Sequence, residues 1–190
     1  MQVTNVLSDL FKYNTGYLAK HLNHMDKSRL YIRPDGYHNP IIWILGHIIV
    51  SRGSLLELLG EESRSGNLNR FFASGTYPLN DPTGYPEFSE LMGQLQKFGS
   101  KLVHHIGEGG DDLLQRQVWG DYENIGKYVV NGYIHETYHV GQINYLLSLT
   151  AGMQSMKSKL SIGSRNKKKG STGKTGVFSL SGLRSILTVR

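Results

Sequence analysis

The stretch IGKYVVNGYIHETYHVGQINYLLSL, residues Ile125–Leu149, decides the fold that this sequence predicts. Eight of its residues follow one another at alternating steps of three and four, which places them along one face of an α-helix: Ile125, Tyr128, Gly132, His135, His139, Gln142, Leu146 and Leu149. The ends of this face are apolar, whereas its middle is His, His, Gln. Two imidazoles at i and i+4 project side by side, and in this geometry one helix can hold one metal ion.

Apolar residues recur with a helical period in three further segments of the chain. Asn39-Pro40 opens the second of these, because Asn is a good N-cap and Pro suits the first helical position. Glycines at 107, 109 and 110 are expected to end the third. The predicted helices are Val3–Met25, Pro40–Gly60, Pro86–Ile106 and Glu123–Gly152. Four amphipathic helices without an alternating strand pattern predict an all-α fold, an antiparallel four-helix bundle.

Residues Glu61–Tyr85 have no sustained period and contain several Gly and Pro residues. We interpret this segment as an irregular loop, and loops of this length in compact domains are usually functional or disordered. Four aromatic residues are expected to pack the loop onto the bundle as a lid: Phe71, Phe72, Tyr77 and Tyr85.

The net charge of +6 is concentrated at the end of the chain. Residues 153–190 contain nine of the 21 Lys and Arg and none of the 15 Asp and Glu, so residues 1–152 have a net charge of −3. We therefore expect a four-helix domain over residues 1–152 and a flexible, disordered basic tail, rich in Ser, Gly and Lys, over residues 153–190. Because the domain itself is mildly acidic, no specific nucleic-acid partner is expected.

The chain contains no cysteine, which excludes disulfides and thiolate metal sites and leaves His, Asp and Glu as metal ligands. The N-terminus lacks a basic region followed by an apolar run, so no signal peptide is predicted. The longest strongly apolar run, Ile41–Val50, is interrupted by Gly46 and His47 and is too short to span a bilayer. These features predict a cytoplasmic protein without a membrane partner.

His47 is the best candidate for a third metal ligand beside His135 and His139. It lies in the apolar segment expected to face the core, and ligands on facing helices of a bundle converge inward. A single His on an apolar face is more often a hydrogen-bonded core residue. Two adjacent buried imidazoles change this balance, since burying them without a partner costs several kcal/mol, and a metal ion supplies the partner. Bonds of about 2.0–2.1 Å to each imidazole nitrogen are expected for zinc.

The chain resembles the DinB/YfiT-like metalloenzymes in two parts of its sequence: NPIIWILGHIIV with His47, and HETYHVGQINYLLSLTAG with His135, His139 and Gly141-Gln142. The resemblance covers about residues 1–152, a size in agreement with one domain. It implies a four-helix bundle, often dimeric, in which a histidine triad holds a divalent metal ion. It also implies a small-molecule substrate, because relatives include transferases and isomerases that use the thiols bacillithiol or mycothiol.

The segment HETYH also matches H-E-x-x-H, the signature of zinc proteases in which the Glu is the general base. Such proteases take a third ligand downstream of the pair, and residues 140–190 contain no His, Asp or Glu. Glu136 lies about 100° around the helix from His135, so we interpret it as a surface residue or a support for the ligands. The protease is therefore the less favoured hypothesis.

These observations lead to the hypothesis of a metal-dependent enzyme, a hydrolase or a thiol-dependent transferase. Three imidazoles suit zinc, nickel and iron comparably, so the metal stays open. The walls of a substrate pocket are expected from Asn14, Tyr17, Trp43, Tyr128, Gly132 and Gln142. The alternative is a non-catalytic helical bundle with structural histidines that acts as a dimerisation or binding module. A third hypothesis makes the basic tail the functional part and the bundle its carrier.

Overall fold

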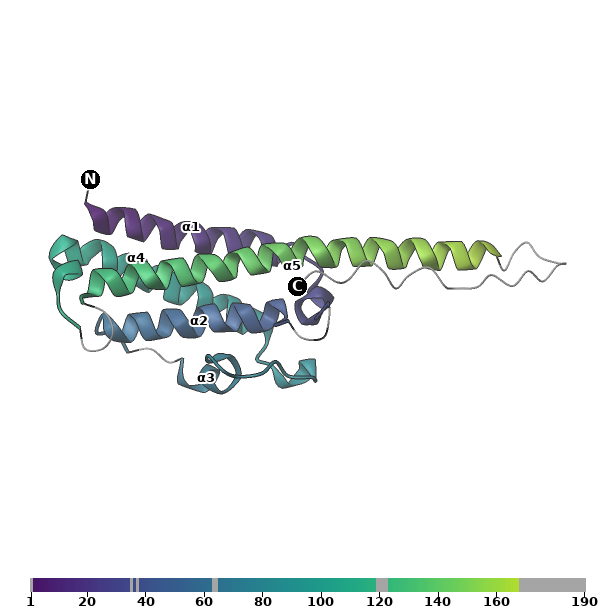
Figure 1. Cartoon of the computed structure of the whole chain (residues 1–190), viewed down its shortest axis with the longest axis horizontal. Helices are drawn as coiled ribbons and strands as arrows, with labels where there is room; N and C mark the ends of the chain where they lie inside the picture. The colour runs from purple at the N-terminus through teal and green to yellow at the C-terminus, as the bar shows by residue number, and fades with distance from the viewer. Residues whose placement is uncertain (1, 35, 37, 63–64, 119–122, 168–190) are drawn as a thin grey trace. The chain divides into compact units, whose positions relative to one another are not determined.

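A computed structural model describes residues 2–34, 36, 38–62, 65–118 and 123–167, and every regular element within them is a helix (Figure 1). The α-helices are α1 (Val3–Asn23), α2 (Ile41–Leu58), α3 (Gly66–Phe72), α4 (Phe88–Gln115) and α5 (Ile125–Lys167). Two 3₁₀ helices, η1 (Lys27–Tyr31) and η2 (Pro82–Gly84), lie in the connections. The predicted all-α helical bundle is confirmed. The chain divides into two compact units, Met1–Ala151 and Gly152–Arg190, and the bundle belongs to the first.

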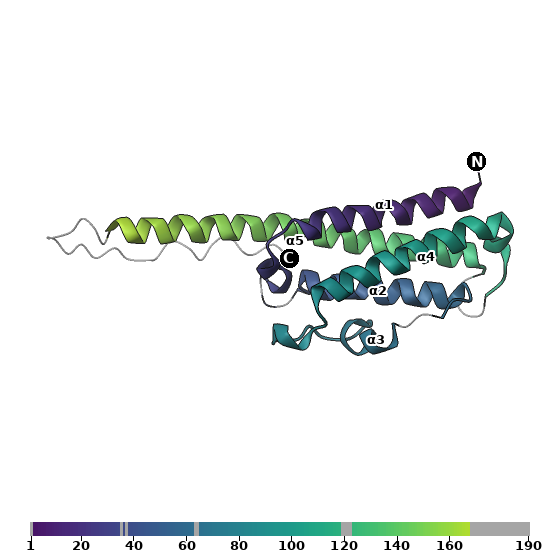
Figure 2. The same ribbon diagram turned by 180° about the vertical axis from the view of Figure 1, so that it is seen from behind.

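The bundle contains antiparallel and parallel neighbours (Figures 1 and 2). α1 is antiparallel to α4, and α2 is antiparallel to α5, whereas α1 runs parallel to α5 and α2 parallel to α4. Two contacts show the direction of each pair. For the antiparallel pairs, they are Thr4 with Asp111 and Ser8 with Val103 between α1 and α4, and Leu55 with Gly132 and His47 with His139 between α2 and α5. For the parallel pairs, they are Asn14 with Thr137 and Tyr17 with Asn144 between α1 and α5, and Arg52 with Leu95 and Glu61 with Lys101 between the α2 and α4 segments. A parallel pair of consecutive long helices needs a long connection, and residues 59–87 provide it.

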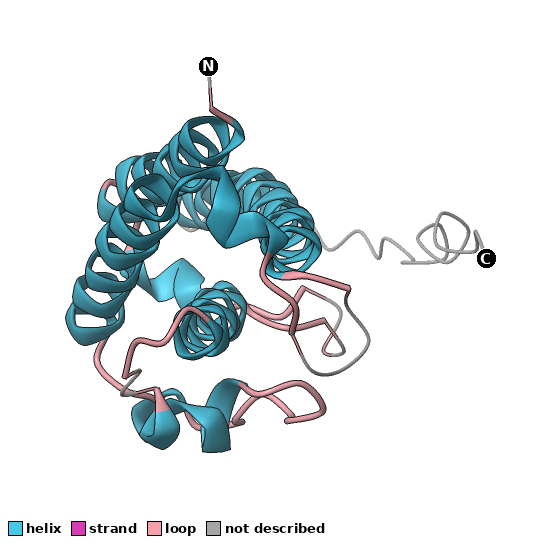
Figure 3. Ribbon diagram, turned by 90° about the vertical axis from the view of Figure 1, so that its left-hand side faces the viewer, coloured by secondary structure: helices cyan, strands magenta, loops and turns pink. Residues whose placement is uncertain are grey.

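Helix α2 is buried on all sides from Ile41 to Val50, whereas Ser54 and Glu57 near its end are exposed. Seen end on, it lies between α3 below it and the other long helices above it (Figure 3). Its length and mean hydropathy of 1.5 are those of a helix able to cross a membrane, yet 78% of the helix is buried inside the protein. Gly46 permits the close contact with the connection, because a Cβ at this position would lie 2.4 Å from the ring of Phe72. The apolar composition of α2 is therefore explained by its central place in the core.

The connection predicted as an irregular loop contains α3 and η2, so that prediction is wrong in this part. The aromatic side chains of Phe72 and Tyr85 are buried and stack with ring centroids 5.7 Å apart. Phe71 is partly buried against the core, but Tyr77 is 89% exposed. The segment therefore covers α2 through three of its four aromatic residues.

Two predicted helix ends differ from the structure. α4 continues through Gly107 and Gly109 to a kink at Gly110, whose φ of 61° is left-handed, and then to Gln115. α5 continues past Gly152 to Lys167, so the first part of the predicted disordered tail is helical. A glycine in a helix interior costs only about 1 kcal/mol relative to alanine, which one flanking helix can absorb. Residues 168–190 lie outside the described residues.

Candidate metal centre

His47 of α2 and His135 and His139 of α5 come together inside the bundle. The Nε2 atom of His135 lies 3.3 Å from Nε2 of His47 and 3.1 Å from Nε2 of His139. Each residue offers one ligand atom, and these atoms all lie within 4.8 Å of one another. Tetrahedral coordination with bonds of about 2.0–2.1 Å requires nitrogen atoms about 3.4 Å apart. The cluster predicted from the sequence therefore has dimensions that can hold a metal ion.

Hydrogen bonds on the far side of two rings orient their lone pairs toward the centre. Nδ1 of His47 lies 2.7 Å from the carbonyl oxygen of Phe72, and Nδ1 of His139 lies 2.7 Å from Oε1 of Gln142. Both oxygens are acceptors, so both Nδ1 atoms carry the proton. The Nε2 atoms of His47 and His139 then both direct a lone pair toward Nε2 of His135. This nitrogen carries at most one proton, so it can donate a hydrogen bond to only one of them. A cation satisfies all three nitrogens at once, which makes this donor set fit a metal ion.

Burial favours the neutral form of the His135 and His139 imidazoles. Desolvation, followed by the nearby His47, lowers the pKa of His135 below its ordinary value of 6.5. Desolvation lowers the pKa of His139 to about 4, although the hydrogen bond to Gln142 acts in the opposite direction. Neutral imidazole is the form that binds metals, so little competition from protons is expected at neutral pH.

Aromatic side chains support the ligand rings. The indole of Trp43 stacks on His47 with ring centroids 5.0 Å apart and an interplanar angle of 10°. Its Nε1 donates to Oγ1 of Thr76 in the connection, at 3.2 Å. On the other helix, Nε2 of Gln142 donates to the hydroxyl of Tyr138 at 3.0 Å. The Tyr138 side chain is exposed, so the site approaches the surface beside His139.

The predicted pocket residues take different places. Trp43 contacts His47, and Gln142 contacts His139, as described above. A Cβ on Gly132, one turn before His135, would lie 3.5 Å from Leu55 of α2. Away from these contacts, Asn14 is buried and donates to Oγ1 of Thr137, Tyr17 donates to Oδ1 of Asn144, and Tyr128 packs against the core.

The structure also contains a buried ion pair that the sequence reasoning missed. Both oxygens of Glu136 accept hydrogen bonds from Arg52 at 2.7 Å, and both residues are almost completely buried. Glu136 is thus not a surface residue, and its carboxylate is engaged by a guanidinium, which opposes the zinc-protease hypothesis. A signal was present in the sequence: Glu136 is the only Asp, Glu, Lys or Arg between Lys127 and Lys157. An isolated charge in an apolar helix requires a buried partner.

A family model for the DinB superfamily matches residues 10–143 of the chain. The matched part contains all three histidines of the cluster, the whole of α2 and the first part of α5. The chain belongs to the DinB superfamily. The family resemblance read from the two sequence motifs is therefore confirmed. Among curated proteins, none matches this chain.

Proposed function

We propose that this member of the DinB superfamily is a metal-dependent enzyme in which His47, His135 and His139 bind one divalent ion. The observation that supports the proposal is the convergence of three Nε2 atoms, two of them fixed as lone-pair donors by Phe72 and Gln142. Zinc, nickel and iron all suit three imidazoles. A site with three protein ligands leaves a coordination position for water or substrate, as in catalytic zinc centres.

The bound ion would supply Lewis-acid chemistry, polarising a carbonyl or lowering the pKa of a coordinated water or thiol. The protein's own groups would hold the ligand rings: Phe72 and Trp43 fix His47, and Gln142 fixes His139. Tyr138, exposed beside His139, would contact an entering molecule. We propose a small-molecule substrate in the cytoplasm and either hydrolysis or transfer to a low-molecular-weight thiol. Glu136 has no role as a base in this scheme, because Arg52 occupies both of its oxygens.

Metal analysis of the purified full-length chain tests the proposal. We expect about one divalent ion per chain, and its loss in His135→Ala. His105→Ala is the matched control, because His105 lies on α4 and pairs with Glu61 at 2.9 Å. Metal-free protein that takes up no zinc, nickel or iron on titration would contradict the proposal.

The non-catalytic alternative also predicts a metal, but without an open position. Cobalt(II) in the site distinguishes the two, since its absorption spectrum reports coordination number and ligand exchange. For an enzyme, added small thiols or anions should change the spectrum while the metal stays bound. An unchanged spectrum at saturating concentrations of these molecules would favour the structural role.

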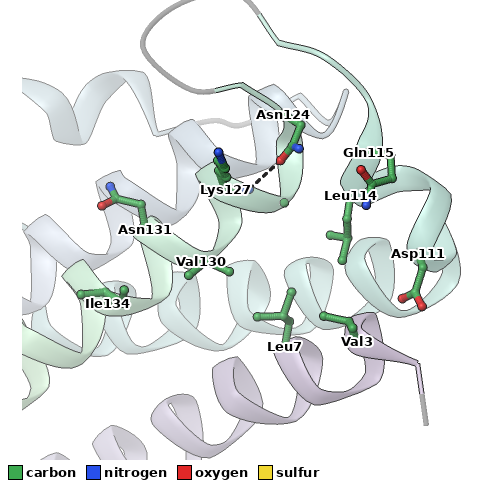
Figure 4. Close-up of a pocket in the computed structure, with 11 residues that line it drawn as sticks. Val3, Leu7, Asp111, Leu114, Gln115, Asn124, Lys127, Val130, Asn131 and Ile134 are labelled. Carbon is green, nitrogen blue, oxygen red and sulfur yellow. Dashed lines mark hydrogen bonds between the residues drawn. The ribbon is translucent and has the colours of Figure 1, made fainter.

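We further propose that the partner of this chain is a second copy of itself. The outer face of α5 carries exposed apolar residues and no exposed charge over about five turns, a length of about 30 Å: Val130, Ile134, Tyr138, Tyr145 and Leu149. Beside its first part, a largely apolar groove lies between the starts of α1 and α5 and the end of α4, and Figure 4 shows Val3 and Leu7 of α1 and Val130 of α5 around it. An uncharged stripe of this length is self-complementary across a two-fold axis.

Analytical ultracentrifugation tests the dimer. Ile134→Glu should convert the protein to a monomer, because the substitution places a charge within the stripe. Lys97→Glu on the exposed side of α4 is the control and should sediment as the unmodified protein does. A wild-type monomer at micromolar concentration would contradict this part of the proposal and leave the metal proposal intact.

A further inference from the structure

The ion pair between Arg52 and Glu136 lies next to the metal ligands in both helices. Glu136 directly follows His135 on α5, and Arg52 follows His47 on α2 by five residues. Nε and Nη2 of Arg52 each donate to one oxygen of Glu136, at 2.7 Å in both cases. Arg52 is 1% exposed and Glu136 is 2% exposed. This two-point contact fixes both the distance and the angle between the helices more tightly than one hydrogen bond can.

Arg52 also connects this pair to α4. Its Nη1 donates to the backbone carbonyl of Leu95 at 2.9 Å. The approach depends on Gly99, because a Cβ there would lie 2.8 Å from Nη1 and 2.7 Å from Oγ1 of Thr15. The guanidinium therefore joins three helices at one level of the bundle, and the sequence of α4 leaves space for it.

The apolar pattern of α2 does not fix its orientation. Ile and Leu occur on every side of this helix, and its residues from Ile41 to Val50 are all buried. A rotation of α2 by one residue, about 100°, would still bury apolar side chains. The same rotation would turn His47 away from α5. The polar groups of α2 must therefore select the orientation in which the three histidines meet.

We infer that the Arg52–Glu136 pair is a positioning device that sets the register and rotation of α2 against α5, so that His47 meets His135 and His139. The inference rests on the proposed metal site and assigns the pair no contact with substrate. A buried ion pair is a weak source of net stability, since replacing both partners by apolar side chains is often neutral or stabilising. Specificity of helix pairing is a role that such buried polar groups fulfil in other helical assemblies.

The double variant Arg52→Met/Glu136→Leu separates positioning from stability. It removes both charges and fills the space with side chains of similar volume, so the full-length chain should unfold at a similar temperature. Zinc affinity, measured by competition with a chelator, should fall by about 10- to 100-fold, the usual loss when a group supporting a ligand is removed. Unchanged zinc affinity in a folded double variant would overturn the inference. The exposed pair of Glu123, just before α5, and Lys127, in its first turn, supplies the control, Glu123→Leu/Lys127→Met, which should keep wild-type affinity.

Glu136→Asp is a second variant in case the double variant does not fold. It keeps the charge opposite Arg52 but shortens the side chain by one methylene, so the helices must move to preserve the contact. We expect weaker zinc binding with the fold retained. Wild-type zinc affinity in Glu136→Asp would count against the inference, because a positioning contact should be sensitive to this length.

A readout without metal keeps this inference distinct from the proposed function. The chain has no cysteine, and a Cβ on Gly132 would lie 3.5 Å from Leu55, so Leu55→Cys/Gly132→Cys reports the α2–α5 register. Mild oxidation should form the disulfide in this double-cysteine variant. When Arg52→Met/Glu136→Leu is added, the fraction of cross-linked chains should fall to half or less. Equal cross-linking in both backgrounds would overturn the inference. Failure of the wild-type chain to bind zinc, nickel or iron would refute the metal site alone, and the cross-linking result would still decide the role of the pair.

Discussion

Two pairs of helices in the bundle, a first half of α1 and α4 and a second half of α2 and α5, are oriented by different kinds of contact. In α1 and α4, buried apolar residues recur with the helical period and charged residues such as Lys97 lie outside. In α2, apolar residues are buried on every side, while α5 exposes Ile134 and Tyr145 and buries the charge of Glu136. The histidine cluster lies in the second half. The comparison indicates that the apolar pattern orients α1 and α4, whereas contacts between buried polar groups orient α2 and α5.

The largest expected effect comes from removing one charge of the Arg52–Glu136 pair and leaving the other in place. Glu136→Gln leaves the Arg52 guanidinium buried without a counter-charge, which should cost about 3–5 kcal/mol of the free energy of unfolding. Glu123→Gln, at an exposed position just before α5, should leave it nearly unchanged. Urea titration of both variants measures the difference. Equal stability of the two would mean that the ion pair does not carry the orientation of α2.

The difference between the halves also explains what the sequence could predict. The helical period of the apolar residues predicted the helix in residues 86–106 correctly, and the structure buries the face formed by Leu91, Leu95, Phe98, Leu102 and Ile106. The face of α5 was read less well. Its most buried positions include Val129, Glu136, Ile143 and Thr150, whereas Leu149 of the predicted face is 36% exposed. Because the outer residues of α5 are as apolar as the inner ones, no period could choose between them.

The clustering of the site residues was predictable for a different reason. Burying two imidazoles at i and i+4 without a partner is costly, so His135 and His139 indicated a third group, and the apolar surroundings of His47 selected it. The support of His47 by Phe72 was not predictable, because α3 is a short helix inside a segment rich in Gly and Pro. Short elements of this kind are held by their contacts with α2 rather than by local preference.

Metal binding should stabilise the second half and thereby the whole domain. At a free zinc concentration of 100 times Kd, the free energy of unfolding should rise by about 2.7 kcal/mol. For a protein of this size, this is a rise in Tm of roughly 5–10 °C. His139→Ala should show no rise on addition of zinc. Thermal unfolding with zinc and with a chelator makes the test, and identical Tm values for the wild-type chain would contradict zinc binding at this site.

A methyl group can be added to a glycine in each half of the bundle, to α2 by Gly46→Ala and to α4 by Gly93→Ala. Gly46 faces Phe72, whose ring atoms would lie 2.4 Å from the new Cβ, so overpacking should cost about 1–3 kcal/mol. Gly93 lies in α4 with open space around it, and alanine there should stabilise by about 0.5–1 kcal/mol. Opposite signs of the two changes in urea titrations would sharpen the comparison. Gly46→Ala should also weaken zinc binding, since Phe72 carries the oxygen that orients His47.

The smallest expected effect is the pH dependence of the metal-free protein. Burial lowers the pKa of His139 from 6.5 to about 4 in the folded state, so the unfolded chain binds a proton first as the pH falls. Stability contributed by the neutral ring is complete well above pH 6.5 and is lost progressively as the pH falls toward 4. Between pH 7 and 5.5, the loss from this one residue should be about 1 kcal/mol.

His139→Asn tests the assignment of this pH dependence, because it removes the titrating ring and keeps a polar side chain near Gln142. Urea titrations of the two metal-free proteins at pH 7 and 5.5 should show a smaller loss in the variant. A loss of the same size in both would assign the slope to other groups. With zinc bound, the slope of the wild-type protein should become steeper, since protons then compete with the metal for the ligand nitrogens. If zinc does not change the slope of stability against pH, the ring that titrates does not bind the metal. Burial of this part of α5 would then be unrelated to metal binding.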